Sequence, residues 1–193
     1  MKNSYLTKIL ISLILICSLT FSQAHASTDL ELQKDRAQAL YNLGILKGYP
    51  DGSLGLNDNI KRCEFFTMVI RILGYENDFD TTDVKLPFPD INKSHWAFNN
   101  VKAAYKLGLI NGNPDGTLTP DNYITYSEVL AVLIRALGYS DPGSKAGKWP
   151  DRIINLAKSL GMTKDIDIPA SKQVTRGEVS VIIYNTLTVN FKK

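Results

Sequence analysis

The sequence predicts an all-helical protein made of three copies of one helix–loop–helix unit. A shift of 64 residues aligns residues 44–75 with residues 108–139 without a gap, and the two segments agree at 13 of 32 positions. Both contain a Pro-Asp-Gly turn and then an apolar face with the i, i+3, i+4, i+7 spacing of an amphipathic helix. Units of this kind bury their apolar faces against one another, which predicts a single bundle.

A third copy is shorter than the other two. Leu-Gly-Met at 160–162 aligns with Leu-Gly-Leu at 107–109, and Val-Thr-Arg-Gly-Glu at 174–178 aligns with Ile-Thr-Tyr-Ser-Glu at 124–128. The spacing from glycine to glutamate is 20 residues in the first two copies and 17 in the third. The third copy has therefore lost three loop residues, including its Pro-Asp-Gly turn.

A tryptophan marks the start of the second and third copies. Trp96 and Trp149 each lie 12 residues before the glycine of their copy, where the first copy has Leu32. We interpret both tryptophans as core anchors, because large aromatic side chains bury the most area, and a role in stacking on a sugar is the less favoured alternative. The three copies are placed at residues 29–75, 88–139 and 148–191.

Helix boundaries follow from capping signals. In the second copy Ser94 is a good N-cap and Gly108 a good stop, so a first helix is expected between them. Its expected buried stripe is Trp96, Val101, Ala104, Tyr105 and Leu107. Thr125-x-x-Glu128 and Thr175-x-x-Glu178 are capping boxes that should start the second helices of copies two and three. Lys61 holds this position in the first copy and predicts a weaker helix start.

Residues 1–26 have the layout of a secretory signal peptide. Two lysines precede an apolar run at 9–19, and Ala-His-Ala follows at 24–26. The apolar run is too short to span a membrane, so no transmembrane segment is expected. A lipoprotein anchor at Cys17 is the less favoured alternative, because the residues before it are bulkier than that processing usually accepts.

Removal of this segment leaves a nearly neutral protein. The net charge falls from +3 to +1, because two lysines leave and every acidic residue stays. A neutral balance argues against a nucleic-acid-binding surface. Cys63 becomes the only cysteine, which precludes an intrachain disulfide, and we expect it to be a small buried residue.

No pattern in the chain indicates catalysis or a metal. The loop from Asn111 to Asn122 resembles part of a calcium loop, but its twelfth position is an amide rather than a bidentate glutamate. His95 is the only histidine after residue 26, and no nucleophile and base with a recognisable spacing accompany it. We therefore expect no enzyme activity, no cofactor and no metal.

Four motifs in order resemble a known family. Phe-Pro-Asp at 88–90, His-Trp-Ala at 95–97, Gly-Tyr-Pro-Asp-Gly at 48–52 and Val-Thr-Arg-Gly-Glu at 174–178 are similar to the signature of the S-layer homology domain. The resemblance covers roughly residues 29–193. It implies a pseudo-threefold helical bundle that holds secondary cell-wall polysaccharides, often through sugars that carry a pyruvate ketal.

The resemblance also implies where the ligand would bind. A helix N-terminus offers amides to an anion, and an arginine just after the cap can grip a carboxylate with two bonds. The corresponding residues are Arg62 and Arg176, with Tyr126 in the second copy, where the ring could stack on a sugar. Gly48 and Gly112 would let the backbone approach the glycan. The expected ligand-binding set is Arg62, Arg176, Tyr126, Gly48, Tyr49, Asp51, Gly112 and Asp115.

Two functions from different classes remain open on the sequence. The first is a secreted module, associated with the wall or S-layer, that anchors non-covalently to a secondary cell-wall polysaccharide. The second is an envelope structural or adaptor protein that contacts an S-layer or exported protein and has reduced affinity for glycan.

Overall fold

The computed structural model describes residues 29–77 and 79–192, so the signal peptide predicted at 1–26 lies outside the described part. Residues 29–42 are helical. The later elements are α2 Arg62–Ile72, α3 Phe98–Lys106, α4 Tyr126–Ala136, the short 3-10 helix η1 Ser144–Ala146, α5 Asp151–Ser159 and α6 Arg176–Thr186. Across the described residues, strand pairing is limited to isolated bridges, which confirms the all-helical prediction. No helix among them has the length and apolar character needed to cross a membrane.

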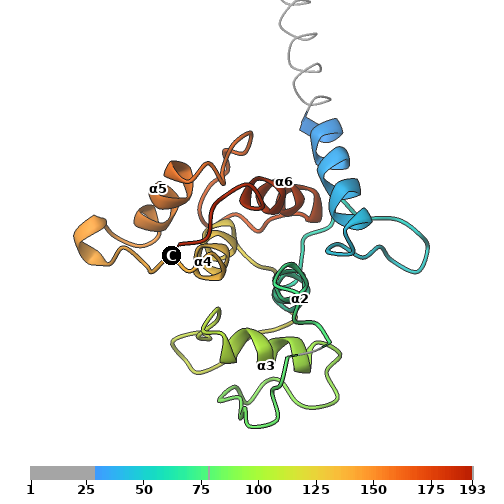
Figure 1. Cartoon of the computed structure of the whole chain (residues 1–193), viewed down its shortest axis with the longest axis vertical. Coiled ribbons are helices and arrows are strands. Elements are labelled where there is room, and N and C mark those ends of the chain that lie inside the picture. Colours follow the sequence, from blue (N-terminus) through green and yellow to red (C-terminus); the bar gives the residue numbers. More distant parts are fainter. Residues whose placement is uncertain (1–28, 78, 193) are drawn as a thin grey trace, which may run out of the picture.

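The copies interlock rather than stand side by side. In Figure 1 the second helices α2, α4 and α6 gather at the centre, and the helix at 29–42, α3 and α5 lie outside them. The second helix of one copy packs on the first helix of the next, α2 on α3 and α4 on α5. Arg36 closes the circle, because its guanidinium lies 4.0 Å from the ring centre of Tyr184 on α6. The arrangement is the pseudo-threefold bundle that the sequence predicted.

Three backbone hydrogen bonds form a ring at the centre of the bundle. The amide of Ile60 donates to the carbonyl of Val174 at 3.0 Å, and the amide of Val174 donates to the carbonyl of Ile124 at 3.1 Å. The amide of Ile124 donates back to the carbonyl of Ile60 at 3.2 Å. All three residues are 0% exposed. Each copy therefore needs the other two to satisfy its buried backbone.

The starts of the central helices are bonded to neighbouring copies. In α2 the amide of Arg62 donates to the carbonyl of Asn122 and the amide of Cys63 to that of Pro120, both at 2.9 Å. The first two amides of α4 donate to the carbonyls of Lys172 and Ala170. Those of α6 donate to the carbonyls of Asp58 and Leu56. The hypothesis that these amides are unpaired and open to an outside anion is therefore wrong, because the bundle itself uses them.

The predicted caps are present. The carboxylate of Glu128 accepts from the amide of Thr125, and that of Glu178 accepts from the amide of Thr175, both at 2.9 Å. In the first copy the amide of Lys61 donates to the carboxylate of Glu64 at 2.8 Å. The glutamate half of the capping box thus survives where the threonine is missing.

Two details of the sequence prediction need correction. The first helix of copy two begins at Phe98 instead of following Ser94, whose amide is held in a turn by the side chain of Asn92 at 3.0 Å. Because Trp96 precedes the helix, it lies on the surface and is 60% exposed, while Trp149 is 45% exposed. The interpretation of both tryptophans as core residues is wrong. Val101 and Ala104 are buried as expected.

The central ring predicts a large cost for removing an apolar side chain there. Ile124→Ala should lower the free energy of unfolding by about 2–5 kcal/mol, because the side chain is fully buried and a cavity would remain. Leu43→Ala, at a position that is 64% exposed, should change it by less than about 0.5 kcal/mol. Denaturant unfolding of both variants measures the difference, and equal stabilities would refute a core centred on this ring.

Candidate functional site

Three equivalent grooves lie between the copies, and we number each by the copy whose loop and second helix form it. The second groove encloses about 290 Å³. Its walls are the loop at 110–114 and the α4 side chains Glu128, Val132 and Arg135. Arg62 from the first copy and Trp149 from the third complete it. The second groove is thus assembled from three copies.

The first groove repeats this construction with about 160 Å³. The loop at 46–49 and the α2 side chains Glu64, Met68 and Arg71 form the walls. Arg176 occupies the place of Arg62, and Trp96 occupies the place of Trp149. The predicted residues Gly48 and Tyr49 line this groove, as Gly112 lines the second.

The third groove is smaller and acidic. It encloses about 100 Å³ and has Leu32 where the others have tryptophan. Its lining includes the carboxylates of Asp29, Asp165, Asp167 and Glu178. An anionic ligand would meet like charge in this groove and an apolar side chain in place of an indole.

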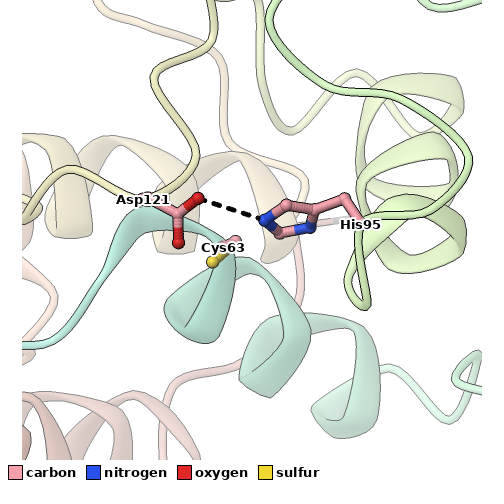
Figure 2. Close-up of side chains that lie close together, drawn as sticks. All are labelled: Cys63, His95 and Asp121. Atoms are coloured by element: carbon pink, nitrogen blue, oxygen red, sulfur yellow. Dashed lines mark ion pairs between the residues drawn. The ribbon is translucent and has the colours of Figure 1, made fainter.

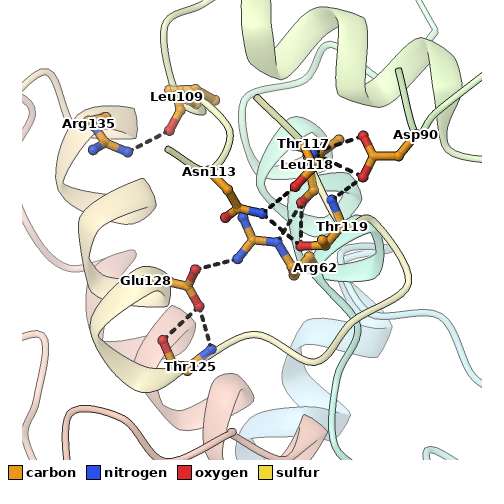
Figure 3. A network of polar contacts seen from close by, with 10 residues as sticks. All are labelled: Arg62, Asp90, Leu109, Asn113, Thr117, Leu118, Thr119, Thr125, Glu128 and Arg135. Atoms are coloured by element: carbon orange, nitrogen blue, oxygen red, sulfur yellow. Dashed lines mark hydrogen bonds and ion pairs between the residues drawn. The ribbon is translucent and has the colours of Figure 1, made fainter. Parts of the chain in front are cut away.

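Arg62 is the buried centre of the second groove (Figure 3). The residue is 8% exposed, its Nε donates to the carbonyl of Leu118 at 3.0 Å, and one terminal nitrogen binds the Glu128 carboxylate. Burial alone would raise the pKa of Glu128, but hydrogen bonds from Thr125 and the charge of Arg62 outweigh it and hold this pKa below its usual value. The pair ties the loop of copy two to α2 and α4.

The loop of the second copy is also held by its own motifs. The Asp90 carboxylate accepts from the amides of Leu118 at 2.9 Å and Thr119 at 2.6 Å. Gly112 has φ +75°, and a Cβ atom there would lie 2.4 Å from the ring of Phe88. The Phe-Pro-Asp motif and this glycine therefore hold the loop in the conformation that forms the wall of the groove.

Arg176 binds carbonyls of the loop of the first copy, as Arg62 binds a carbonyl of the loop of the second. Its Nε donates to the carbonyl of Leu54 at 2.8 Å and a terminal nitrogen to that of Lys47 at 2.6 Å. Its guanidinium lies 4.7 Å from the ring centre of Tyr49 and 3.7 Å from a Glu64 oxygen. Arg176 is 4% exposed. Both arginines thus line the predicted grooves with most of their surface covered, and their contact with a ligand stays a prediction.

The third groove lacks the arginine and the loop together. Tyr126 stands at the arginine position and is 2% exposed. Its hydroxyl lies near the side chain of Thr163 but forms no hydrogen bond of regular geometry among the described residues. The ring face that would stack on a sugar is covered by protein. Lys172, from the third copy itself, supplies the cation for Glu178. An arginine here would find no loop carbonyls to bind, so the two changes belong together.

Two predicted residues face away from the grooves. The carboxylate of Asp51 accepts from the amide of Ser53 at 2.9 Å, and that of Asp115 accepts from the amide of Thr117 at 3.0 Å. These local bonds lower the pKa of both carboxyls and stabilise the Pro-Asp-Gly turns. Neither aspartate lines any of the three grooves.

Sequence reasoning missed Arg135 in the second groove. Its guanidinium donates to the carbonyl of Leu109 at 2.9 Å and forms no direct ion pair within the described part of the chain. Its charge is attracted to Asp141, whose carboxylate pairs directly with Arg152. The equivalent Arg71 is neutralised by Glu76 at 2.9 Å. The signal was present in the repeat alignment, because Ser140 stands where the first copy has Glu76.

Cys63, His95 and Asp121 lie close enough to suggest a metal site (Figure 2). The amide of Ala97 donates to Nδ1 of His95 at 3.1 Å, so in the neutral ring Nε2 carries the proton and faces Asp121 at 3.4 Å. Lys61 already pairs with Asp121 at 2.9 Å. Burial raises the pKa of the Cys63 thiol to about 12. These states suit a structural polar cluster rather than metal ligands or an activated nucleophile.

The two kinds of groove predict opposite effects of substitution at one equivalent position. Arg62→Ala should cost about 1.5–3 kcal/mol of unfolding free energy, because Glu128 and the Leu118 carbonyl lose a charged partner. Tyr126→Phe should leave stability unchanged or raise it by about 1 kcal/mol, because a buried hydroxyl that forms no regular hydrogen bond among the described residues is removed. Thermal or urea unfolding tests both, and a neutral Arg62→Ala would contradict the assigned role.

Comparison with known proteins gives the same picture. The S-layer homology domain family matches residues 35–66 and 87–130. The chain is 30% identical over 181 residues to a middle cell wall protein of Brevibacillus brevis, covering 91% of this chain and 17% of that protein. It is 32% identical over 155 residues to a cell surface protein of Thermoanaerobacter kivui, covering 80% and 20%.

A third relative is a cellulosome-anchoring protein of Acetivibrio thermocellus, 28% identical over 157 residues, with 74% of this chain and 35% of that protein covered. The chain therefore corresponds to a minor part of the length of these relatives. The family match covers three of the four motifs, those at 48–52, 88–90 and 95–97, and the central-ring residues Ile60 and Ile124 of the first two copies. Over these residues the chain belongs to the S-layer homology domain family.

Proposed function

We propose that the protein attaches non-covalently to a bacterial cell envelope by binding an acidic secondary cell-wall polysaccharide, and that it acts outside the cell as a non-catalytic wall or S-layer module. Relatives named as cell wall, cell surface and cellulosome-anchoring proteins support this setting. The ligand-binding part is the second groove, with the first groove as a further site. The acidic third groove is excluded.

The observation that carries the proposal is that Arg135 and Trp149 both line the second groove. Burial lowers the pKa of Arg135, but a guanidinium remains charged at any physiological pH. Trp149 contributes an aromatic ring; the residue is 45% exposed, and the Arg152 guanidinium lies 6.0 Å from the ring centre. A sugar ring with a carboxylate, such as a pyruvate ketal, matches one flat apolar surface beside one cation without a carboxylate partner. Arg62, deeper in the groove, is kept as a second contact for the same acid.

Binding to isolated wall tests the proposal directly. The protein from residue 29 onward should sediment with sacculi that retain their secondary polymer and should stay in solution with sacculi stripped of it by acid. Equal binding to both preparations would place the ligand in peptidoglycan and overturn the proposal. Binding to neither would favour the adaptor function, in which an S-layer or exported protein is the partner.

Arg135→Gln should weaken binding to polymer-bearing sacculi roughly ten- to a hundred-fold, the effect of losing one charge-assisted hydrogen bond of about 1.5–3 kcal/mol. Arg135→Lys should recover part of the loss, because it keeps the charge without the planar fork. Arg71→Gln is the matched control and should have a smaller effect, because Glu76 already neutralises that arginine. If Arg71→Gln is the more damaging variant, the assignment of the second groove is wrong.

A further inference from the structure

A cavity larger than any of the three grooves opens beside the first. It encloses about 610 Å³, within the range of about 300–1,000 Å³ typical of small-molecule sites. It shares Tyr49, Glu64 and Trp96 with the first groove, and Asn59 and Tyr123, which precede Ile60 and Ile124 of the central ring, also line it. A ligand in the first groove could therefore continue into this cavity.

Three aromatic side chains line this cavity among polar ones. Trp96 is 60% exposed and Tyr123 is 46% exposed, and the half-buried Tyr49 lies against Arg176. The indole of Trp96 stacks on the imidazole of His95, with ring centres 5.9 Å apart and planes at 27°. Asp121 contacts Nε2 of that imidazole at 3.4 Å (Figure 2). One face of the indole therefore packs on a ring held in place, and the rest of its surface is open. We call Tyr49, Trp96 and Tyr123 the aromatic platform.

The charges around the platform are paired except for one carboxylate, that of Asp58. Lys61 pairs with Asp121, and Glu64 lies near Arg176 and accepts from the amide of Lys61. Asp58 is the remaining charged side chain of the lining. An acidic sugar would find no uncompensated cation here. The carboxamides of Asn57 and Asn59 instead offer donors and acceptors that suit hydroxyl and acetamido groups.

The second groove has no such platform. Asn113 stands at the position of Tyr49, and Gln173 at the position of Tyr123. The two grooves therefore differ in chemistry, with an arginine that lacks a carboxylate partner in the second and stacked aromatic surface beside the first.

We propose that the aromatic platform is a separate subsite that binds neutral sugar units of the same wall polymer by stacking. This inference rests on the proposed function and extends it. The acidic sugar is held by charge in the second groove, while neutral sugars of the chain are held by Tyr123 and Trp96 beside the first. Contact with neutral sugars predicts a contribution to affinity that does not depend on salt.

Sedimentation with polymer-bearing sacculi at low and at high ionic strength tests the subsite. Tyr123→Ala should weaken binding about three- to tenfold at both ionic strengths, and Tyr123→Phe should bind like the wild type because the ring is kept. Gln173→Ala, at the equivalent exposed position, is the control and should have no effect. The melting temperature of each variant is measured alongside. If Tyr123→Ala is destabilised, Trp96→Ala replaces it.

The outcomes separate the two proposals. If the wild-type protein does not sediment with polymer-bearing sacculi, the proposed function itself is overturned. Wild-type binding that is unchanged by Tyr123→Ala overturns the platform and leaves the proposed function standing. A loss confined to low ionic strength overturns the neutral-sugar assignment, because it would reveal an electrostatic contact.

Discussion

The ring of hydrogen bonds through Ile60, Ile124 and Val174 is the constraint on which the rest of the structure depends. It brings the beginnings of α2, α4 and α6 together at the centre of the bundle. The first amides of these helices then donate hydrogen bonds to carbonyls of neighbouring copies. The loop of each copy must then lie beside the helix start of another copy. The grooves follow from this geometry, since no copy can form one alone.

The arginine just after the helix start holds the neighbouring loop in place and so determines the shape of the groove. Arg62 and Arg176 bind loop carbonyls and the capping glutamate of the following copy. Such a buried, charge-assisted network holds a loop rigidly when every member is satisfied. Where the loop is short, in the third copy, a buried Tyr126 replaces the arginine and Lys172 neutralises Glu178. Loss of the third groove is thus one structural change, although it alters two distant stretches of sequence.

Much of the fold could be predicted from local sequence, because its determinants are local. The capping boxes, the helix faces and the left-handed glycines of the Pro-Asp-Gly turns, Gly52 at φ +82° and Gly116 at φ +83°, all lie where the repeat predicts them. The environment of Arg62 was not predictable in this way, because its carbonyl partner Leu118 is 56 residues away and belongs to another copy. Helical spacing also could not show that Trp96 precedes its helix and faces solvent.

The candidate site was predicted in outline and missed in detail. The glycine loops and the two arginines do line grooves. Arg135 was missed because it differs from Arg71 only in lacking an ion pair, since Ser140 stands where the first copy has the carboxylate of Glu76. A motif search considers only the residues within the motif. Comparing one copy with another recovers this difference. Within a repeat protein, positions at which the copies disagree are therefore the better guide to unequal sites.

The central claim, that the second groove holds the wall polymer and the third cannot, is tested most directly by an NMR titration of the isotope-labelled protein with polymer released from sacculi. The account predicts that the indole N–H of Trp149 and the amides of residues 110–114 shift at the lowest polymer concentrations. Residues 29–33 and 165–168 in the third groove should stay unchanged. Shifts that begin in the third groove, or that appear equally in all three, would contradict it.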